Sequence, residues 1–584
     1  MPSASPYILV AFVAYMAGVF LLGALSRTLL KRGAFLKEYF LGDRKLNAWV
    51  LGLTYVATSV SAGSFVGFPS LIYTNGWVMA FWIGGYMVGG LTSKGVLAKR
   101  LNQVSRLSGA ITVPDVLRDR FQSPTLGTMA GVFLLVFLLF NLWGQFKAGG
   151  LIMREACRGI EKTSAYQSAR DRTAHALSAA GALSESDLTV KSDSFYGQRY
   201  PDYVLGVLIF ALTVVAYTTY GGFWAVTWTD VLQGVIIVGG AMLLMVLALI
   251  KVGGLQRATH ELADIDPNLL TGPGPKDFLP PGLAVSFFML WTLGAMGQPV
   301  GMVRLMACRD TPTLRRSLFL IGIYYALIYV PLVITFICAR ALFPTEYLGH
   351  SDEIMPAMAL AVTEDFPLVG GLILAAPYAA AMSAVAGFLL LMSSSLVRDL
   401  YQRNVKSDVS PRTVKLVSYG TTAVVGLLIT FMALHPWEYL QYLIIFSTSG
   451  MACTFLAPTV MALYWKRATR AGALAAVLGG FMAIFLLWGL GWMGVGKAES
   501  QDSAPPETKT PAPSPPSETG KAATNPSIKP LYLWDLDPLA YGLAVSFAAG
   551  IGVSLLTQPP PQDHVNRYFL EKEATADSPP SGLS

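Results

Sequence analysis

Hydrophobic stretches of about 20 residues recur along most of this chain, separated by polar or charged segments. A bilayer core roughly 30 Å thick requires about 20 apolar residues to span it as a helix. The pattern therefore predicts thirteen membrane-spanning helices. Their approximate ranges are 7–26, 47–70, 77–97, 125–150, 202–220, 228–251, 281–304, 317–341, 368–396, 413–434, 438–464, 471–494 and 536–556.

Charge alternates between successive loops. Loops after the first, third, seventh, ninth and eleventh spans are basic, whereas the loop after the eighth span carries acidic residues such as Asp352 and Glu353. Basic loops tend to remain in the cytoplasm. We therefore expect an inner or plasma membrane protein whose N-terminus lies outside and whose C-terminus lies in the cytoplasm.

The composition agrees with a membrane protein. The chain is 53% hydrophobic and 13% charged, against roughly 25% charged residues in soluble domains. Its four cysteines show no metal-ligand spacing, and three of them lie in or near apolar spans, so a disulfide framework is not expected. An outer loop at 158–201 includes a predicted surface helix at 164–180. A second outer loop at 498–530 is rich in Pro, Ser and Thr and is predicted to be disordered.

Two of the spans are interrupted by small and polar residues. They are LTYVATSVSAGSFVGFP, ending at Pro69, and LWTLGAMGQP, ending at Pro299. Small residues also allow close helix packing, but unwound backbone at membrane depth is tolerated where it lines a cavity. Two broken helices favour a transporter. We expect Gly63 and Gly297 to mark the breaks and Pro69 to end the first helix.

Four motifs occur in order along the chain: YFLGDRKL at 39–46, YGGFWAV at 220–226, AAPYAAAMSAVAGFLLLMSSSLVRDLY at 375–401 and ALYWKRATRAGALAAVLGGFM at 462–482. Together they resemble the sodium:solute symporter family, and the resemblance covers nearly all of the chain. It implies an all-α integral membrane fold of about 13 transmembrane helices. That fold contains a five-plus-five inverted repeat of the leucine-transporter type and two broken helices.

The resemblance also implies how the chain is divided. The expected segments are an extra N-terminal span with its loop at 1–46, a first repeat at 47–251, a second repeat at 281–464, two C-terminal spans at 465–557 and a cytoplasmic tail at 558–584. The two broken spans would open the two repeats, as inverted-repeat transporters require.

A sodium site is implied between the second and ninth spans. Its ligands would be the carbonyl oxygens of Ala57, Val60 and Ala380 and the hydroxyl of Ser383. The next family position usually carries a second hydroxyl, but this chain has Ala384, which puts sodium affinity or coupling in doubt unless Ser59 or Ser61 compensates. From the residues alone, packing or a bond to its own helix is the favoured interpretation of Ser383.

The candidate solute-binding residues lie mainly on the two broken spans. They are Ser59, Ser61, Ala62, Gly63, Ser64, Trp291, Ala295, Gln298 and Lys147. Trp291, Gln298 and Pro299 are similar to the proline branch of the family, but Ala295 and Ser59 replace a tyrosine and an aspartate of that branch. LTYVATSVSAGSFVGFP and APYAAAMS resemble the pantothenate branch instead. From the residues alone, Trp291 is equally well explained as a core or interfacial aromatic.

Three charged residues lie in or beside apolar spans. Lys147 either pairs with a solute carboxylate or extends along its own stem to the outer interface, and the second interpretation is favoured because the apolar run ends near Trp143. Asp230 and Arg304 are interpreted as structural or gating partners rather than solute ligands.

These features predict a symporter that uses the sodium gradient to import a small carboxylate such as pantothenate. The alternatives are a sodium/proline-type amino acid symporter and a solute sensor that does not transport. No enzyme is predicted, because no span carries paired carboxylates, a zinc-binding His motif or a Ser/His pairing. The expected partners are the solute, sodium ion as coupling ion and the lipid bilayer, with no nucleic acid and no obligate protein partner.

Overall fold

The computed structural model of the chain describes residues 5–26, 40, 46–183, 200–405, 409–435, 440–493 and 530–569. Several predictions lie outside these described residues. They concern the basic loop after the first span, nearly all of the motif at 39–46, part of the outer loop at 184–199, the Pro-rich stretch at 498–529 and the tail at 570–584.

Every named element in the described residues is a helix. The first half contains α1 (Tyr7–Ser26), α3 (Ala48–Ser59), η3 (Gly63–Gly67), α4 (Phe68–Asn75), η4 (Gly76–Val78), α5 (Met79–Ser93), η5 (Lys94–Ala98), α6 (Lys99–Ser108), α7 (Val113–Phe121), α8 (Pro124–Ala156), η6 (Arg158–Ile160), α9 (Ser164–Ala179), α11 (Tyr200–Val252), α12 (Leu255–Ile265), η7 (Pro267–Leu270) and η8 (Pro275–Asp277). The second half contains α13 (Pro281–Met296), α14 (Pro299–Met306), α15 (Thr311–Leu342), η9 (Ser351–Glu353), α16 (Ile354–Val362), α17 (Pro367–Ser394), η10 (Ser395–Gln402), α18 (Pro411–Ala433), α19 (Leu440–Tyr464), α20 (Arg470–Trp492), α21 (Pro538–Leu556) and α22 (Gln562–Phe569).

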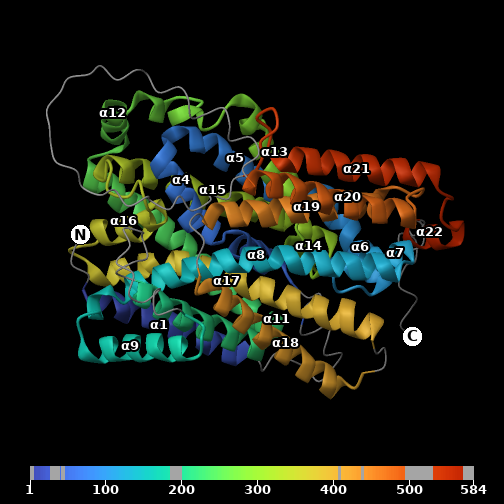
Figure 1. The fold of residues 1–584 in the computed structure, drawn as a ribbon, viewed down its shortest axis with the longest axis horizontal. Helices are drawn as coiled ribbons and strands as arrows, with labels where there is room; N and C mark the ends of the chain where they lie inside the picture. The colour runs from blue at the N-terminus through green and yellow to red at the C-terminus, as the bar shows by residue number, and fades with distance from the viewer. Residues whose placement is uncertain are drawn as a thin grey trace, which may run out of the picture.

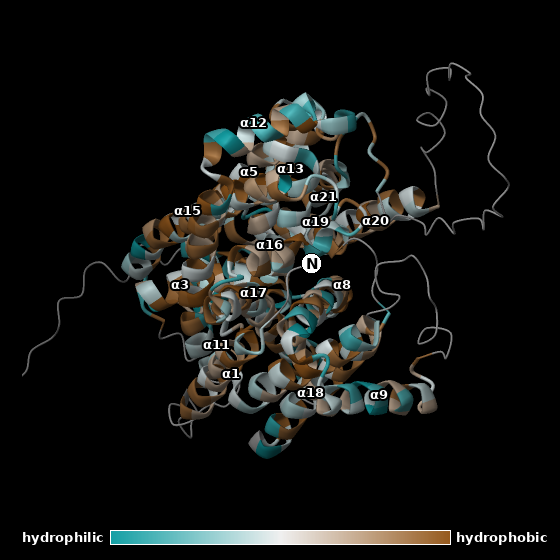
Figure 2. Ribbon diagram, turned by 90° about the vertical axis from the view of Figure 1, so that its left-hand side faces the viewer, coloured by the Kyte–Doolittle hydropathy of each residue, from teal (hydrophilic) through white to brown (hydrophobic). Residues whose placement is uncertain are grey.

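The long helices run roughly side by side along the longest axis of the molecule, with α9, α12 and α16 near one end and α6, α7 and α22 near the other (Figure 1). Hydrophobic residues cover much of the long helices, whereas α9 and α12 carry more hydrophilic residues (Figure 2). The predicted surface helix at 164–180 is confirmed as α9. The arrangement is that of a helical membrane protein with polar elements at its ends.

The predicted number of spans needs one adjustment. Ten helices in the described residues are long and apolar enough to cross a membrane, or eleven with one bent pair that extends from Ala48 to Ser108. That pair covers the two predicted spans at 47–70 and 77–97. Helix α11 has 53 residues, about 80 Å at 1.5 Å per residue, and covers the predicted spans at 202–220 and 228–251. Gly222 interrupts it with φ 61° and ψ −155°. Because the bent pair and α11 each cover two predicted spans, the ten helices and the bent pair together account for all thirteen predicted spans.

Side-chain caps explain where several spans begin. The side chains of Ser123, Asp310 and Thr469 accept hydrogen bonds from the backbone N–H groups of the first turns of α8, α15 and α20. Such caps satisfy donors that have no partner inside the helix. Proline also occupies the first turn of α8 and α15, where its missing N–H costs no hydrogen bond.

Helices α17 and α19 form the centre of the molecule. Within their apolar segments 94% of the residues are buried, compared with 28% for α1 and 33% for α21. Helix α17 packs against α3, and α19 packs against η3 and α13. Both of these deeply buried helices therefore contact the interrupted spans.

Candidate functional site

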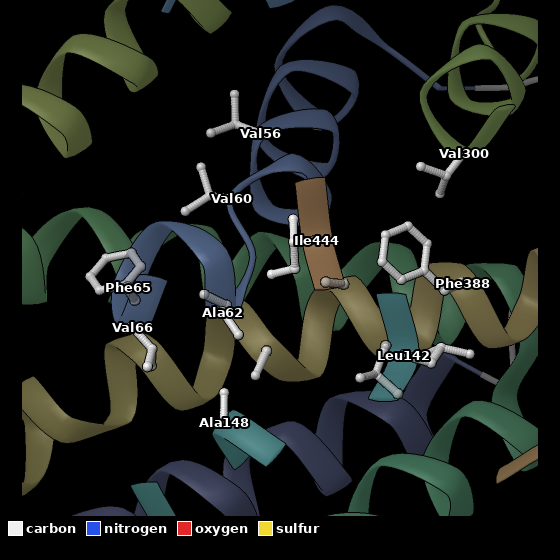
Figure 3. Close-up of a cluster of buried hydrophobic side chains, with 14 of the residues drawn as sticks. Val56, Val60, Ala62, Phe65, Val66, Leu142, Ala148, Val300, Phe388 and Ile444 are labelled. Atoms are coloured by element: carbon white, nitrogen blue, oxygen red, sulfur yellow. The ribbon is translucent and has the colours of Figure 1, made fainter. Parts of the chain in front are cut away.

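The first broken helix opens just before Gly63. Helix α3 ends at Ser59, Val60 is extended with φ −77° and ψ 97°, and the π-helical turn η3 begins at Gly63. The two arms are bent by 57°. Figure 3 shows Val60 and Ala62 on either side of the break, with Ile444 beside them. The Ala62 N–H, which the break leaves without a helical partner, donates to Gln145 Oε1 at 2.8 Å.

Pro69 has a different role from the one predicted. It lies inside the second arm, in the first turn of α4, which continues directly from η3, whereas the first arm ends ten residues earlier, at Ser59. The expectation that Pro69 ends the first helix is wrong. The π-helical turn η3 directly precedes Pro69, so the helical hydrogen-bond pattern is already irregular where the proline lacks a backbone N–H.

The second interrupted span breaks at Gly297. Helix α13 ends there, Gln298 has ψ 114°, and Pro299 begins α14. A Cβ at Gly297 would lie 2.5 Å from Ala452 Cα, and a Cβ at Gly63 would lie 2.8 Å from Ile444 Cδ1. Both glycines therefore mark breaks and close approaches, as predicted. Both also face the same helix, α19.

A central cavity of about 30 Å³ lies beside the first break. It is lined by Thr58, Ser59, Ser61, Gly63, Ser64, Phe68, Tyr86, Asn141, Trp291, Gln298, Phe388, Gln441, Ile444 and Thr448. Six of the nine candidate solute-binding residues are in this set: Ser59, Ser61, Gly63, Ser64, Trp291 and Gln298. The structure thus brings residues from both broken spans, more than 200 positions apart, to one cavity.

Several hydroxyl groups at the cavity are held in place by hydrogen bonds. Ser59 Oγ donates to the Tyr55 carbonyl at 2.6 Å, and Tyr86 Oη donates to the Ser59 carbonyl. Ser64 Oγ shares a hydrogen bond of 2.8 Å with Tyr329 Oη. These bonds fix the positions of the oxygens while leaving lone pairs on them.

Aromatic rings form one wall of the central cavity. The ring centroid of Trp291 lies 4.7 Å from that of Tyr86 and 5.7 Å from that of Phe68, both in edge-to-face contacts. The indole N–H of Trp291 is buried and has no hydrogen-bond partner among the described residues. Trp291 therefore belongs to the cavity wall and retains an unused donor.

Three candidate solute-binding residues do not line the central cavity. The Ala62 backbone is bonded to Gln145, and Ala295 Cβ lies near Gly89 of α5. Lys147 is 1% exposed, and its Nζ lies 2.9 Å from Asp352 Oδ2. The interpretation that Lys147 extends to the outer interface is wrong, because an acidic partner from η9 allows the ammonium group to remain buried.

A second ion pair accompanies Lys147. Arg154, two turns further along α8, contacts Glu353 of η9 and lies 3.0 Å from Glu155. Asp352 and Glu353, which are adjacent in η9, therefore form ion pairs with two basic side chains of α8. This arrangement ties the end of α8 to the segment between α15 and α16.

The candidate sodium ligands are all fully buried. Ala57, Val60, Ala380 and Ser383 are 0% exposed, as is Ala384. Ala57 lies in the last turn of α3, where the carbonyl groups lack partners in the following turn. Val60 lies in the extended segment after it. The break thus supplies carbonyl oxygens that an intact helix would have used internally.

Ser383 also contacts a charged group. Its Oγ donates to Asp230 Oδ1 at 2.5 Å, while Asp230 Oδ2 accepts from Arg304 Nη2 at 2.8 Å and from Thr58 Oγ1 at 3.4 Å. The Asp230 carboxylate thereby connects α11, α14, α3 and α17. The interpretation of Asp230 and Arg304 as structural partners agrees with this network.

A larger cavity of about 300 Å³, here called the vestibule, lies beside α4 and the start of α19. Its lining residues are Ser70, Leu71, Asn75, Trp82, Pro275, Lys276, Phe278, Leu283, Phe287, Asp352, Gln441, Tyr442, Ile445 and Tyr532. Gln441 lines both the vestibule and the central cavity. The two cavities therefore meet at this side chain.

Sequence reasoning missed several lining residues. Asn141 offered a signal, because it is a polar residue inside the apolar run LLFNLWG. Gln441 lies at the beginning of its span, where a polar residue is unremarkable. Tyr86 and Phe388 are apolar-compatible residues in apolar helices, so nothing in the sequence distinguishes them from other core residues.

A family model and curated relatives match this chain over most of its length. The model of the sodium:solute symporter family matches residues 39–166 and 201–480. A sodium/pantothenate symporter of Haemophilus influenzae is 30% identical over 488 residues, covering 83% of this chain and 90% of that protein. A high-affinity proline transporter of Bacillus subtilis is 27% identical over 467 residues, covering 78% and 88%. The solved structure of a Na+-coupled sialic acid symporter, in a substrate-bound outward-open state, matches with a TM-score of 0.64 and 20% identity, covering 95% of this chain and 99% of that one.

Proposed function

Because this chain belongs to the sodium:solute symporter family, we propose that it imports a small carboxylate such as pantothenate, using the sodium gradient, by alternating access. The resemblance to this family that the sequence motifs indicated is confirmed by the match to the family model. The chain is a multi-pass membrane transporter whose partners are sodium ion and a solute. The identity of the solute is our proposal.

The observation that carries the proposal is the chemistry of the central cavity. No acidic side chain occurs among the described residues that line it. Hydroxyl and amide donors together with the N-terminal ends of broken helices can bind a carboxylate. A cationic amine would find no counter-charge among these lining residues, because Ser59 stands where the proline branch resembled by this chain has an aspartate. The sodium/pantothenate relatives favour the same solute class.

For the coupling ion, we propose the site formed by the carbonyls of Ala57, Val60 and Ala380 and the hydroxyl of Ser383. The support is the unwound backbone after α3 and the burial of all four residues. Small hard cations prefer oxygen ligands of this type. Ala384 contributes no hydroxyl, so this site has one fewer side-chain oxygen than the family pattern.

Coupling follows from thermodynamics. If sodium and solute bind the same conformation, each raises the affinity of the other by the same factor. The membrane potential contributes about 2.3 kcal/mol per charge per 100 mV.

We further propose that α9 lies outside the cell and α22 in the cytoplasm. Labelling of cysteines introduced into these two helices with an impermeant reagent tests that orientation, and equal labelling from outside would contradict it.

A proline-type amino acid is the second candidate. Trp291 and Gln298 line the central cavity, both are similar to the proline branch, and proline transporters are among the relatives. The two candidates differ in which charged group of the solute is essential. A pantothenate-like solute presents a carboxylate as its only charged group, whereas proline also presents a cationic amine.

Uptake into proteoliposomes with an imposed sodium gradient distinguishes these possibilities. Labelled pantothenate should accumulate only with the gradient, and unlabelled pantothenate should compete whereas its methyl ester should not. Equal competition by acid and ester, or uptake of proline in place of pantothenate, would contradict the carboxylate proposal. Sodium-dependent binding without accumulation would indicate a sensor.

A further inference from the structure

Gln441 lies between the two cavities and has an unusual environment. It is in the first turn of α19, is 6% exposed, and lines both the vestibule and the central cavity. Neither its Nε2 nor its Oε1 has a hydrogen-bond partner among the described residues. A buried amide without partners is costly, so a partner that enters the cavity would compensate for its burial.

The neighbouring residues allow the amide to reach the break. A Cβ at Gly67 would lie 2.0 Å from Gln441 Oε1, and a Cβ at Gly63 would lie 3.2 Å from it. Both glycines belong to η3, which follows the unwound segment. Any larger residue at Gly67 would displace this side chain. The absence of a Cβ there keeps the amide beside the candidate solute site.

A second amide at the same break provides a comparison. Gln145 of α8 is also buried, but its Oε1 accepts from the Ala62 N–H at 2.8 Å and its Nε2 donates to Asn141 Oδ1 at 3.2 Å. Gln145 therefore stabilises the broken backbone. Gln441 makes no such bond among the described residues, although it lies at the boundary between the two cavities. The two amides have different roles.

We infer that Gln441 is a solute-contacting residue that determines specificity, and that its amide binds an amide or hydroxyl group at the end of the solute opposite the carboxylate. This inference rests on the proposed function. The hydroxyls of Ser59, Ser61 and Ser64 lie on the broken helix, whereas Gln441 lies at the vestibule side of the same cavity. A side-chain amide both donates and accepts, so it matches a neutral polar group. The solute class is therefore a carboxylate that carries a second, uncharged polar group.

Binding to the purified full-length protein in sodium tests this inference. The probes are pantothenate and heptanoate, a carboxylate without amide or hydroxyl groups. Gln441→Met retains the length of the side chain and removes both hydrogen-bonding atoms. We expect about a tenfold or greater loss of pantothenate affinity, the magnitude of a lost buried hydrogen bond, with heptanoate affinity unchanged. Tyr442→Phe, next to it in the vestibule lining only, should preserve the preference for pantothenate.

Thermal stability distinguishes solute contact from a structural role. Without solute, Gln441→Met should unfold at the same or a higher temperature than the unsubstituted protein, because it removes an unpaired buried amide. Gln145→Met should unfold at a lower temperature, because Ala62 N–H loses its acceptor. A lower unfolding temperature for Gln441→Met, or an unchanged ratio of pantothenate to heptanoate affinity, would overturn the inference alone. An unsubstituted protein that binds neither carboxylate would overturn the proposed function and the inference with it.

Discussion

Ser383 provides the most direct test of the proposed sodium site. Its side chain is fully buried, and its hydroxyl donates to Asp230 Oδ1 at 2.5 Å. A hydroxyl has one donor and two acceptor lone pairs. Donation to Asp230 therefore leaves the oxygen lone pairs available to an ion and restricts their direction. Ser383→Ala removes this oxygen without adding volume.

The type of interaction that is lost determines the size of the expected effect. An interaction between a hydroxyl and a charged group contributes about 1.5–3 kcal/mol, and each 1.4 kcal/mol corresponds to about a factor of ten. The sodium concentration for half-maximal uptake should therefore rise roughly tenfold or more in Ser383→Ala. The fold should survive, because Asp230 retains Arg304 at 2.8 Å and Thr58 at 3.4 Å.

Sodium titration of solute uptake in proteoliposomes measures this change. Ser393→Ala is the matched control: Ser393 is equally buried on the same helix but bonds to the Ser418 carbonyl and to Thr421. The reciprocal variant Ala384→Ser, which adds the hydroxyl of the family pattern, should lower the required sodium concentration. An unchanged sodium dependence in Ser383→Ala, at normal expression, would refute the assignment.

Two further predictions concern stability. Lys147→Met or Asp352→Asn alone should destabilise the protein by about 3–5 kcal/mol, because each removes one partner of a buried ion pair. The double variant should lose less than the sum of the two, and additive losses of unfolding temperature would contradict a coupled pair. Gly297→Ala should lower the free energy of unfolding by about 1–3 kcal/mol, because the added methyl group overpacks against the backbone of α19. Gly489→Ala is the control and should not destabilise the protein, because no neighbouring atom lies within 4 Å of the added methyl group. Equal thermal stability of the two variants would contradict this reasoning.

The features that the sequence predicted correctly are local. A membrane span is recognisable from its own hydropathy, and a broken span from its own small and polar residues. Residues next to a break face the space that the break opens, which is why Ser61, Ser64 and Gln298 line the central cavity as expected. The same argument explains the correct placement of Gly63 and Gly297.

The features that the sequence did not predict depend on partners far along the chain. Lys147 pairs with Asp352, 205 residues away, and Ser383 donates to Asp230, 153 residues away. From hydropathy alone Asp352 is an acidic residue of an outer loop, and nothing local indicates that it turns inward to meet α8. Nothing in the sequence distinguishes Gln441 either, because a glutamine at the start of a span usually faces the interface, and its position beside η3 follows from the tertiary structure.

The sizes of the two cavities indicate which movement admits a solute. The central cavity measures about 30 Å³ and the vestibule about 300 Å³. A single water requires roughly 10–15 Å³, so the central cavity in this conformation is too small for an organic solute. Helix α19 lies directly against both breaks: Ile444 and Gln441 lie beside the glycines of η3, and Ala452 lies beside Gly297. Separating α19 from the two breaks would therefore enlarge the solute site from both sides. Since Gln441 lies where α19 meets η3, a solute that binds its amide would favour the separated state, as a ligand must if it is to shift a conformational equilibrium.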